Sequence, residues 1–142
     1  MTFVSESIDI DVPVDVLFNL YAEPESLPSV LSIVKHVEVL GPDLIRWDVE
    51  LVGQRRSIDA KVVVNEPGKR LRWESVEGRA SFAAEVRTEE ITPASTRVTV
   101  DAEFDAGGIA ERLGLAKPIA AAAIASELRS AKKTAEAQAA AG

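Results

Sequence analysis

The sequence contains no cysteine, and its 142 residues include a single histidine. The lack of cysteine excludes disulfides, thiolate metal sites and cysteine nucleophiles. One histidine provides no cluster of ligands for zinc or haem, so we expect neither a metal nor another cofactor. Long apolar runs are missing as well: the longest, residues 119–125, is far shorter than the ~20 residues of a membrane-spanning helix. We therefore expect no integral membrane association.

Basic residues are outnumbered by acidic ones, and the formal net charge is −7. An acidic chain repels phosphate backbones, so we expect no binding of nucleic acids. The first residues carry neither a basic cluster nor an apolar signal core, which favours a cytoplasmic protein. The length and the balance of 46% hydrophobic and 27% charged residues are typical of one soluble domain. We predict that this domain spans residues 1–142, with residues 137–142 frayed because they have nothing to bury.

Alternation of apolar and polar residues predicts seven strands. It begins within residues 2–12, where Val4, Ile8 and Ile10 share one phase, the period of a strand with one buried face. Six further segments between Val34 and Phe104 are separated by glycine and proline turns, which is typical of consecutive antiparallel hairpins. One face of the predicted sheet is apolar, and the other is a mosaic of both charge signs.

Helical signals lie on either side of the six strands. Pro13 suits the first turn of a short helix, and a second short helix is predicted from Pro24 to about Leu31. Near the C-terminus we predict a short helical piece that breaks or kinks at Pro118, followed by a long amphipathic helix. This order predicts an α+β fold in which the C-terminal helix crosses the concave face of a curved seven-stranded antiparallel sheet.

An ordered set of short segments spread over residues 2–136 resembles one family. The segments are residues 6–16, 47 with 52–56, 67 with 71–75, 95–100 and 107–113. Together they are similar to the helix-grip domains of the START-like (SRPBCC) superfamily, specifically the bacterial polyketide cyclase/dehydrase type. The resemblance implies a cavity between sheet and helix. It does not imply one chemistry, because the superfamily includes aromatase/cyclases, hydrophobic-ligand carriers, coenzyme Q-binding proteins and plant hormone receptors.

Small residues occur on both layers that would enclose such a cavity. The predicted inner face of the sheet carries Ala60, Ala84 and Ala102, and the helix adds Ala131 and Ala135. Small residues opposite each other either leave volume between the layers or let the helix settle closer to the sheet. The sequence leaves both outcomes open.

Two charged residues share the phase of the apolar face. Arg56 is in phase with Ile58, and Glu6 is in phase with Val4; a charge that points inward must be paired or hydrated. On one interpretation Arg56 holds a carbonyl, enolate or carboxylate of a ligand and Glu6 is its partner or a base. On the other, both side chains reach solvent. Tyr21 either presents its hydroxyl at the cavity mouth or caps ordinary packing.

Aromatic and aliphatic residues on the inner phase form the predicted walls. Trp47 and Trp73 are either stacking surfaces for a flat guest or parts of a filled core. The full set of predicted ligand-binding residues is Trp47, Trp73, Phe82, Arg56, Ile58, Ala84, Val100, Ile124 and Leu128.

Two functions share this cavity. The favoured one is a carrier or binding protein for a small hydrophobic or aromatic molecule that is polyketide-like or lipid-like. The alternative is an aromatase-type polyketide cyclase/dehydrase in which Arg56, Glu6 and Tyr21 are catalytic, without a metal or nucleotide cofactor. A protein-interaction module without a ligand is a third possibility, since the alanine-rich helix could pack against another copy. Monomer and homodimer both remain open.

Overall fold

Seven antiparallel strands form one sheet. A computed structural model describes residues 2–51, 54–76, 82–104 and 116–141; residues 52–53 and 107–113, which contribute to the family resemblance, lie outside this part. The strand order is β1-β7-β6-β5-β4-β3-β2, so consecutive strands from β2 to β7 are neighbours and β1 closes against β7. The strands are β1 (Thr2–Ile10), β2 (Val34–Gly41), β3 (Leu44–Leu51), β4 (Gln54–Glu66), β5 (Arg70–Ser75), β6 (Phe82–Thr92) and β7 (Ser95–Phe104).

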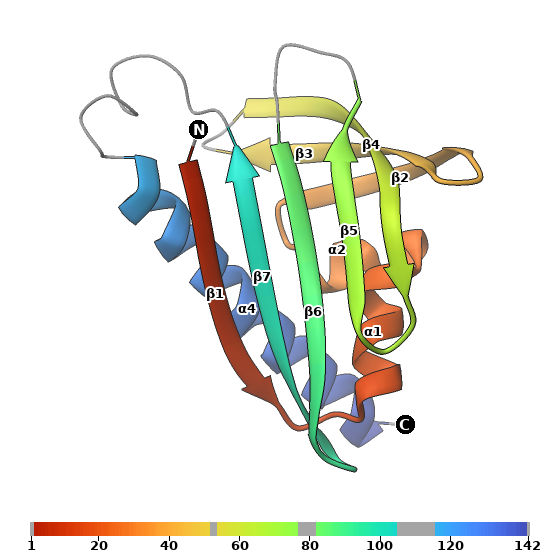
Figure 1. Cartoon of the computed structure of the whole chain (residues 1–142), viewed down its shortest axis with the longest axis vertical. Helices are drawn as coiled ribbons and strands as arrows, with labels where there is room; N and C mark the ends of the chain where they lie inside the picture. The colour runs from red at the N-terminus through yellow and green to blue at the C-terminus, as the bar shows by residue number, and fades with distance from the viewer. Residues whose placement is uncertain (1, 52–53, 77–81, 105–115, 142) are drawn as a thin grey trace.

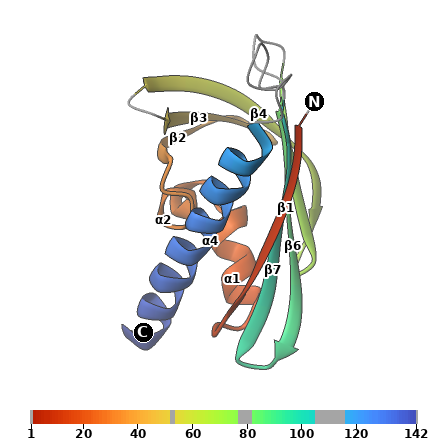
Figure 2. The ribbon, with the colours of Figure 1, turned by 90° about the vertical axis from the view of Figure 1, so that its left-hand side faces the viewer.

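The helices lie together on one side of this curved sheet (Figures 1 and 2). They are α1 (Val14–Ala22), the 3-10 helix η1 (Pro24–Ser26), α2 (Leu27–Val30) and α4 (Ala116–Ala141). Pro13 precedes α1 as its N-cap, and Pro24 follows it closely. The ring of a proline disfavours the helical conformation of the residue before it. Glu23, which precedes Pro24, is accordingly extended, and α1 ends at Ala22. The arrangement confirms the predicted α+β architecture, with its short helices after the first strand.

Helix α4 differs from the sequence prediction at Pro118. The predicted break at Pro118 is wrong: the helix begins at Ala116 and continues through the proline. Pro118 falls in the first turn, where an N–H has no intrahelical partner to lose. At its C-terminal end, residues 137–140 are helical and exposed, and the fraying expected of residues 137–142 stays a prediction.

The attachment of α4 to the sheet is concentrated in its second half. Ala131 and Ala135 are buried there, whereas no residue from 117 to 127 is fully buried. Lys132 Nζ donates to the carbonyl oxygen of Asp9 (3.2 Å), and the amide of Asp11 donates to Glu136 (2.9 Å). The Lys132 ammonium and this amide hold the pKa of Glu136 below its usual range. Small side chains thus let this half of the helix settle against the end of β1.

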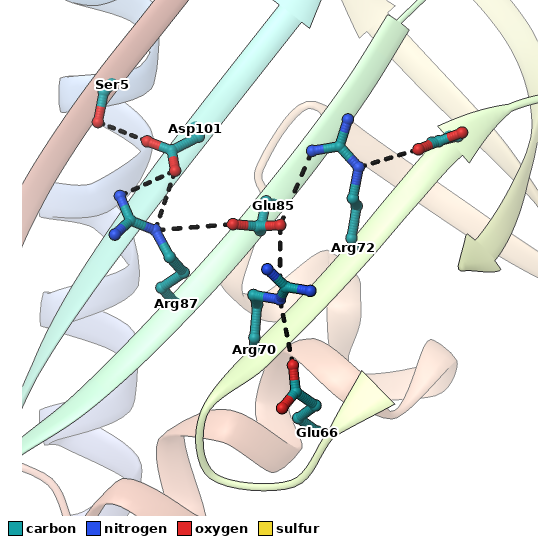
Figure 3. A network of polar contacts seen from close by, with 8 residues as sticks. Ser5, Glu66, Arg70, Arg72, Glu85, Arg87 and Asp101 are labelled. Atoms are coloured by element: carbon teal, nitrogen blue, oxygen red, sulfur yellow. Dashed lines mark hydrogen bonds and ion pairs between the residues drawn. The ribbon is translucent and has the colours of Figure 1, made fainter. Parts of the chain in front are cut away.

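The face of the sheet opposite the helices carries the predicted mosaic of charges (Figure 3). At its centre Glu85 lies within 3.8 Å of three guanidinium groups, those of Arg70, Arg72 and Arg87. Arg87 also pairs with Asp101, at 2.8 Å. In register, Arg70 is opposite Arg87, and Glu85 bridges these two bases. Glu85 is in turn opposite Asp101, and Arg87 bridges these two acids. Each exposed pair contributes little to stability, as is general for surface ion pairs.

Candidate functional site

A cavity of about 340 Å³ lies between the inner face of the sheet and the first half of α4. Every layer of the fold contributes to its wall: α1, the α2–β2 connection, strands β3 to β7, and α4. The described residues that line it are Tyr21, Leu31, Ile33, Trp47, Val49, Ile58, Trp73, Phe82, Ala83, Ala84, Val86, Val100, Ala102, Glu103, Phe104, Ile124, Glu127 and Leu128. The wall is almost entirely apolar, which is typical of sites for small hydrophobic molecules.

Eight of the nine predicted ligand-binding residues line this cavity. They are Trp47, Trp73, Phe82, Ile58, Ala84, Val100, Ile124 and Leu128. The ninth, Arg56, is opposite Val49 in the β3–β4 register, and Val49 is a wall residue. The side chain of Arg56 lies outside the described part of the structure, so its role stays a prediction.

Three aromatic rings form one continuous part of the wall. Trp47 meets Trp73 edge to face, with ring centroids 5.3 Å apart and an interplanar angle of 77°. Phe82 tilts against Trp47 at 5.8 Å. Both tryptophans are buried, so these rings are packed against one another and also face the cavity. The two interpretations of Trp47 and Trp73, wall and core, therefore both describe part of their environment.

Small residues explain where the space comes from. Ala84 on β6 and Ala102 on β7 are directly opposite each other in register, and both line the cavity. At the far end of α4, Ala131 and Ala135 are buried in close packing instead. Both sequence-level outcomes thus occur, at different ends of one helix: open volume beneath its first half and tight contact beneath its second.

Two polar atoms in the wall have no hydrogen-bond partner among the described residues. They are the hydroxyl of Tyr21 and Nε1 of Trp47, and both atoms are buried. Burial raises the pKa of Tyr21, and the nearby charge of Glu127 raises it further. The hydroxyl therefore stays protonated at neutral pH and can donate a hydrogen bond. With 1% of its surface exposed, Tyr21 packs in the hydrophobic core and also lines the cavity.

Glu127 brings a carboxylate to the same wall, a feature that the sequence analysis missed. Its two oxygens accept hydrogen bonds from the amide (2.6 Å) and the hydroxyl (2.5 Å) of Ser32. Ser32 lies between the wall residues Leu31 and Ile33 in the α2–β2 connection. A local signal was available, because Glu127 follows Ile124 by three residues and so lies on the same side of the helix.

Glu6 is not among the described residues that line the cavity. Its position on β1 is opposite Val100, a wall residue, but the side chain is half-exposed. Glu6 has the phase of the inward-facing residues, yet β1 is one of the two edge strands of the sheet. The structure therefore brings Tyr21 and Glu127 to the cavity and leaves Glu6 at its margin; the catalytic role of Glu6 stays a prediction.

Known proteins share the arrangement of a curved sheet and a long helix that encloses this cavity. The family model described as "Polyketide cyclase / dehydrase and lipid transport" matches residues 1–136. The chain belongs to this family. As a member of the polyketide cyclase/dehydrase and lipid transport family, it has the helix-grip fold of the START-like superfamily.

One protein of similar sequence and two solved structures of similar fold illustrate the comparison. An uncharacterized 17.2 kDa protein of Streptomyces lincolnensis is 28% identical over 114 residues, which cover 80% of this chain and 76% of the relative. A START superfamily protein from Mycobacterium smegmatis superposes with a TM-score of 0.74 at 17% identity, over 96% of this chain and 95% of that one. An aromatase/cyclase from Streptomyces sp. R1128 gives 0.74 at 14% identity, over 97% and 93%.

Membership of the polyketide cyclase/dehydrase and lipid transport family supports ligand binding or a cyclase reaction for this protein. Within the described ranges, no cluster of histidine, cysteine, aspartate and glutamate could hold a metal ion. None of the described helices combines the length and the apolar character needed to cross a bilayer.

Proposed function

We propose that the protein binds a small hydrophobic or aromatic molecule, polyketide-like or lipid-like, in this cavity and acts as its carrier or binding protein. The observation that carries the proposal is an apolar cavity whose wall contains two buried hydrogen-bond donors, the Tyr21 hydroxyl and Trp47 Nε1, that find no partner in the described part of the chain. Such a combination of apolar surface and a few polar groups is what small-molecule sites present.

The energetics of the cavity favour an occupant. At roughly 24 cal/mol per Å³, an enclosed void of 340 Å³ that stayed empty and dry would cost about 8 kcal/mol, so water or a guest occupies this partly open space. That is comparable with the whole stability of a domain, about 5–15 kcal/mol. A guest that fills the space restores the missing contacts. Its size is modest, because 340 Å³ is near the lower end of the ~300–1,000 Å³ range of ligand sites.

The two donors indicate what the guest carries. A buried donor without a partner is unfavourable by about 1–3 kcal/mol, so a guest with an acceptor oxygen, such as a carbonyl, gains affinity by satisfying it. The same wall supports binding over turnover. Tyr21 stays protonated, and of the described wall residues only Glu103 and Glu127 carry carboxylates; Glu127 is already held by Ser32.

Prodan, a neutral naphthyl ketone with solvent-sensitive emission, tests this proposal. We expect saturable binding with blue-shifted emission, and we expect Tyr21→Phe to weaken it about fivefold, the value of one hydrogen bond. The variant's emission moves further to the blue, because the carbonyl loses a donor. Fluorescence titration measures both.

Thr88→Val is the matched control for Tyr21→Phe. Thr88 also has a buried hydroxyl without a partner, but it does not line this cavity. Its removal should leave prodan binding unchanged. Failure of prodan and of a panel of apolar ketones and hydrocarbons to bind or to shift the melting temperature would contradict the proposed function. Equal affinity and emission for the native protein and Tyr21→Phe would contradict the role of the hydroxyl.

A second candidate function, a polyketide cyclase/dehydrase reaction, is favoured by the family match and by the protonated Tyr21 hydroxyl in the wall. A donor of this kind stabilises an enolate oxygen as it forms. In this proposal Arg56 supplies the second donor, and Glu6 is the base. We expect Arg56→Leu and Glu6→Gln to abolish turnover of a supplied poly-β-ketone while prodan still binds. Normal turnover in both variants would exclude this mechanism.

A further inference from the structure

Glu127 places a negative charge in the wall of a mostly apolar cavity. Both of its carboxylate oxygens accept hydrogen bonds from Ser32, through the amide at 2.6 Å and through the hydroxyl at 2.5 Å. Two short contacts from one residue hold the carboxylate in one orientation, because each oxygen has its own donor. The carboxylate of this wall residue therefore stays beside Ser32 unless both bonds break.

No described wall residue carries a positive charge that could offset it. The charged side chains among these residues are Glu103 and Glu127, both acidic, and none is lysine or arginine. Burial raises the pKa of the Tyr21 hydroxyl, and the charge of Glu127 raises it further, so this charge is felt in the cavity wall. The side chain of Glu127 is half-exposed and Ser32 is exposed, so the charge lies where the wall meets solvent.

We infer that Glu127 is a specificity-determining residue that restricts the cavity to uncharged guests and excludes carboxylates and sulfonates of the same shape. The inference rests on the proposed function, because it concerns which molecules that cavity accepts. It selects neutral ketones, quinones and alcohols over free fatty acids and aromatic acids. A neutral guest satisfies the donors of Tyr21 and Trp47 and brings no charge toward Glu127.

Two fluorescent probes with one scaffold test this inference: neutral N-phenylnaphthylamine and its sulfonated analogue, anilinonaphthalene sulfonate. We expect the native protein to bind the neutral probe at least about tenfold more tightly. Glu127→Gln should improve binding of the sulfonate about tenfold and leave the neutral probe within about a factor of two. Comparing the ratio of affinities between the two proteins removes the difference in water solubility between the probes.

Ser32→Ala is the matched control, because it removes one hydrogen bond to Glu127 and keeps the charge. It should retain the preference of the native protein. Loss of the preference in Ser32→Ala would overturn the inference, because the tether and not the charge would then set it. An unchanged ratio in Glu127→Gln would overturn it as well. If Glu127→Gln does not fold, a native protein that binds the sulfonate as tightly as the neutral probe overturns it.

The failure of this inference can be told apart from failure of the proposed function. If neither probe binds and prodan does not bind, the cavity is not a binding site and the proposed function fails. If the neutral probe binds and the sulfonate binds equally well in all variants, the proposed function is supported and the inferred role of Glu127 in specificity is excluded. Preference for the sulfonate that disappears in Arg56→Leu would assign the electrostatics of the site to Arg56 instead.

Discussion

Trp73→Ala is expected to lower the free energy of unfolding by about 3–5 kcal/mol, the range for removing a large buried aromatic side chain. Trp73 has 2% of its surface exposed and packs edge to face on Trp47. Its neighbours in register on either side are Val62 and Ala84, which are too small to occupy the space that it leaves. The loss therefore enlarges the existing cavity instead of collapsing it.

Urea titration at 25 °C measures the effect of Trp73→Ala as a lower midpoint with an unchanged m-value. Val39→Ala serves as the control, because Val39 lies on the edge strand β2 with 62% of its surface exposed. That substitution should change stability by no more than about 0.5 kcal/mol. A loss below about 1 kcal/mol for Trp73→Ala would mean that Trp73 is not part of a packed wall.

Filling the cavity with larger side chains should weaken ligand binding without lowering the stability of the fold. We expect the double substitution of Ala84 and Ala102 by leucine to weaken prodan binding by about 100-fold or more, because the added side chains occupy the space of the guest. The two alanines are directly opposite each other and face the cavity. Each added methylene that becomes buried in open space contributes about 0.8 kcal/mol, so stability should hold or rise. Fluorescence titration and thermal unfolding measure the two effects.

Ala131→Leu is the control for that double variant, because it makes the same exchange where no space exists. Ala131 is fully buried against the sheet, and overpacking there should destabilise the protein by about 1–3 kcal/mol. Prodan affinity at a temperature where the variant is folded should hardly change. Tight prodan binding in the double leucine variant would place the guest elsewhere on the protein, and marked destabilisation would contradict the open volume between Ala84 and Ala102.

Most of the wall was predictable because it depends on strand phase. Trp47, Trp73, Ala84 and Val100 each alternate with charged or polar residues, and in consecutive hairpins a single phase fixes the face for a whole strand. The helical residues Ile124 and Leu128 follow from the helical period in the same way. The local sequence pattern was thus sufficient to predict a wall residue wherever that residue lies on a regular strand or helix and faces the opposite layer.

The remaining features depend on contacts between distant segments. Glu127 meets Ser32 across 95 positions of sequence, and no local pattern encodes that pairing. Glu6 has the phase of a core residue but lies on an edge strand, so its depth follows from sheet order and not from alternation. Pro118 is equally compatible with a break and with a first turn, because both leave its missing N–H without cost.

The one-sided attachment of α4 has a consequence for the chamber beneath its first half. The helix is fastened near Ala131 and Ala135 and is tied to β1 through Lys132 and Glu136, whereas the half above the cavity has no fully buried residue before Leu128. Above the cavity the helix is held instead by the two hydrogen bonds from Ser32 to Glu127 and by the buried Leu128. These few contacts, and not a continuous packed interface, set the height of the chamber.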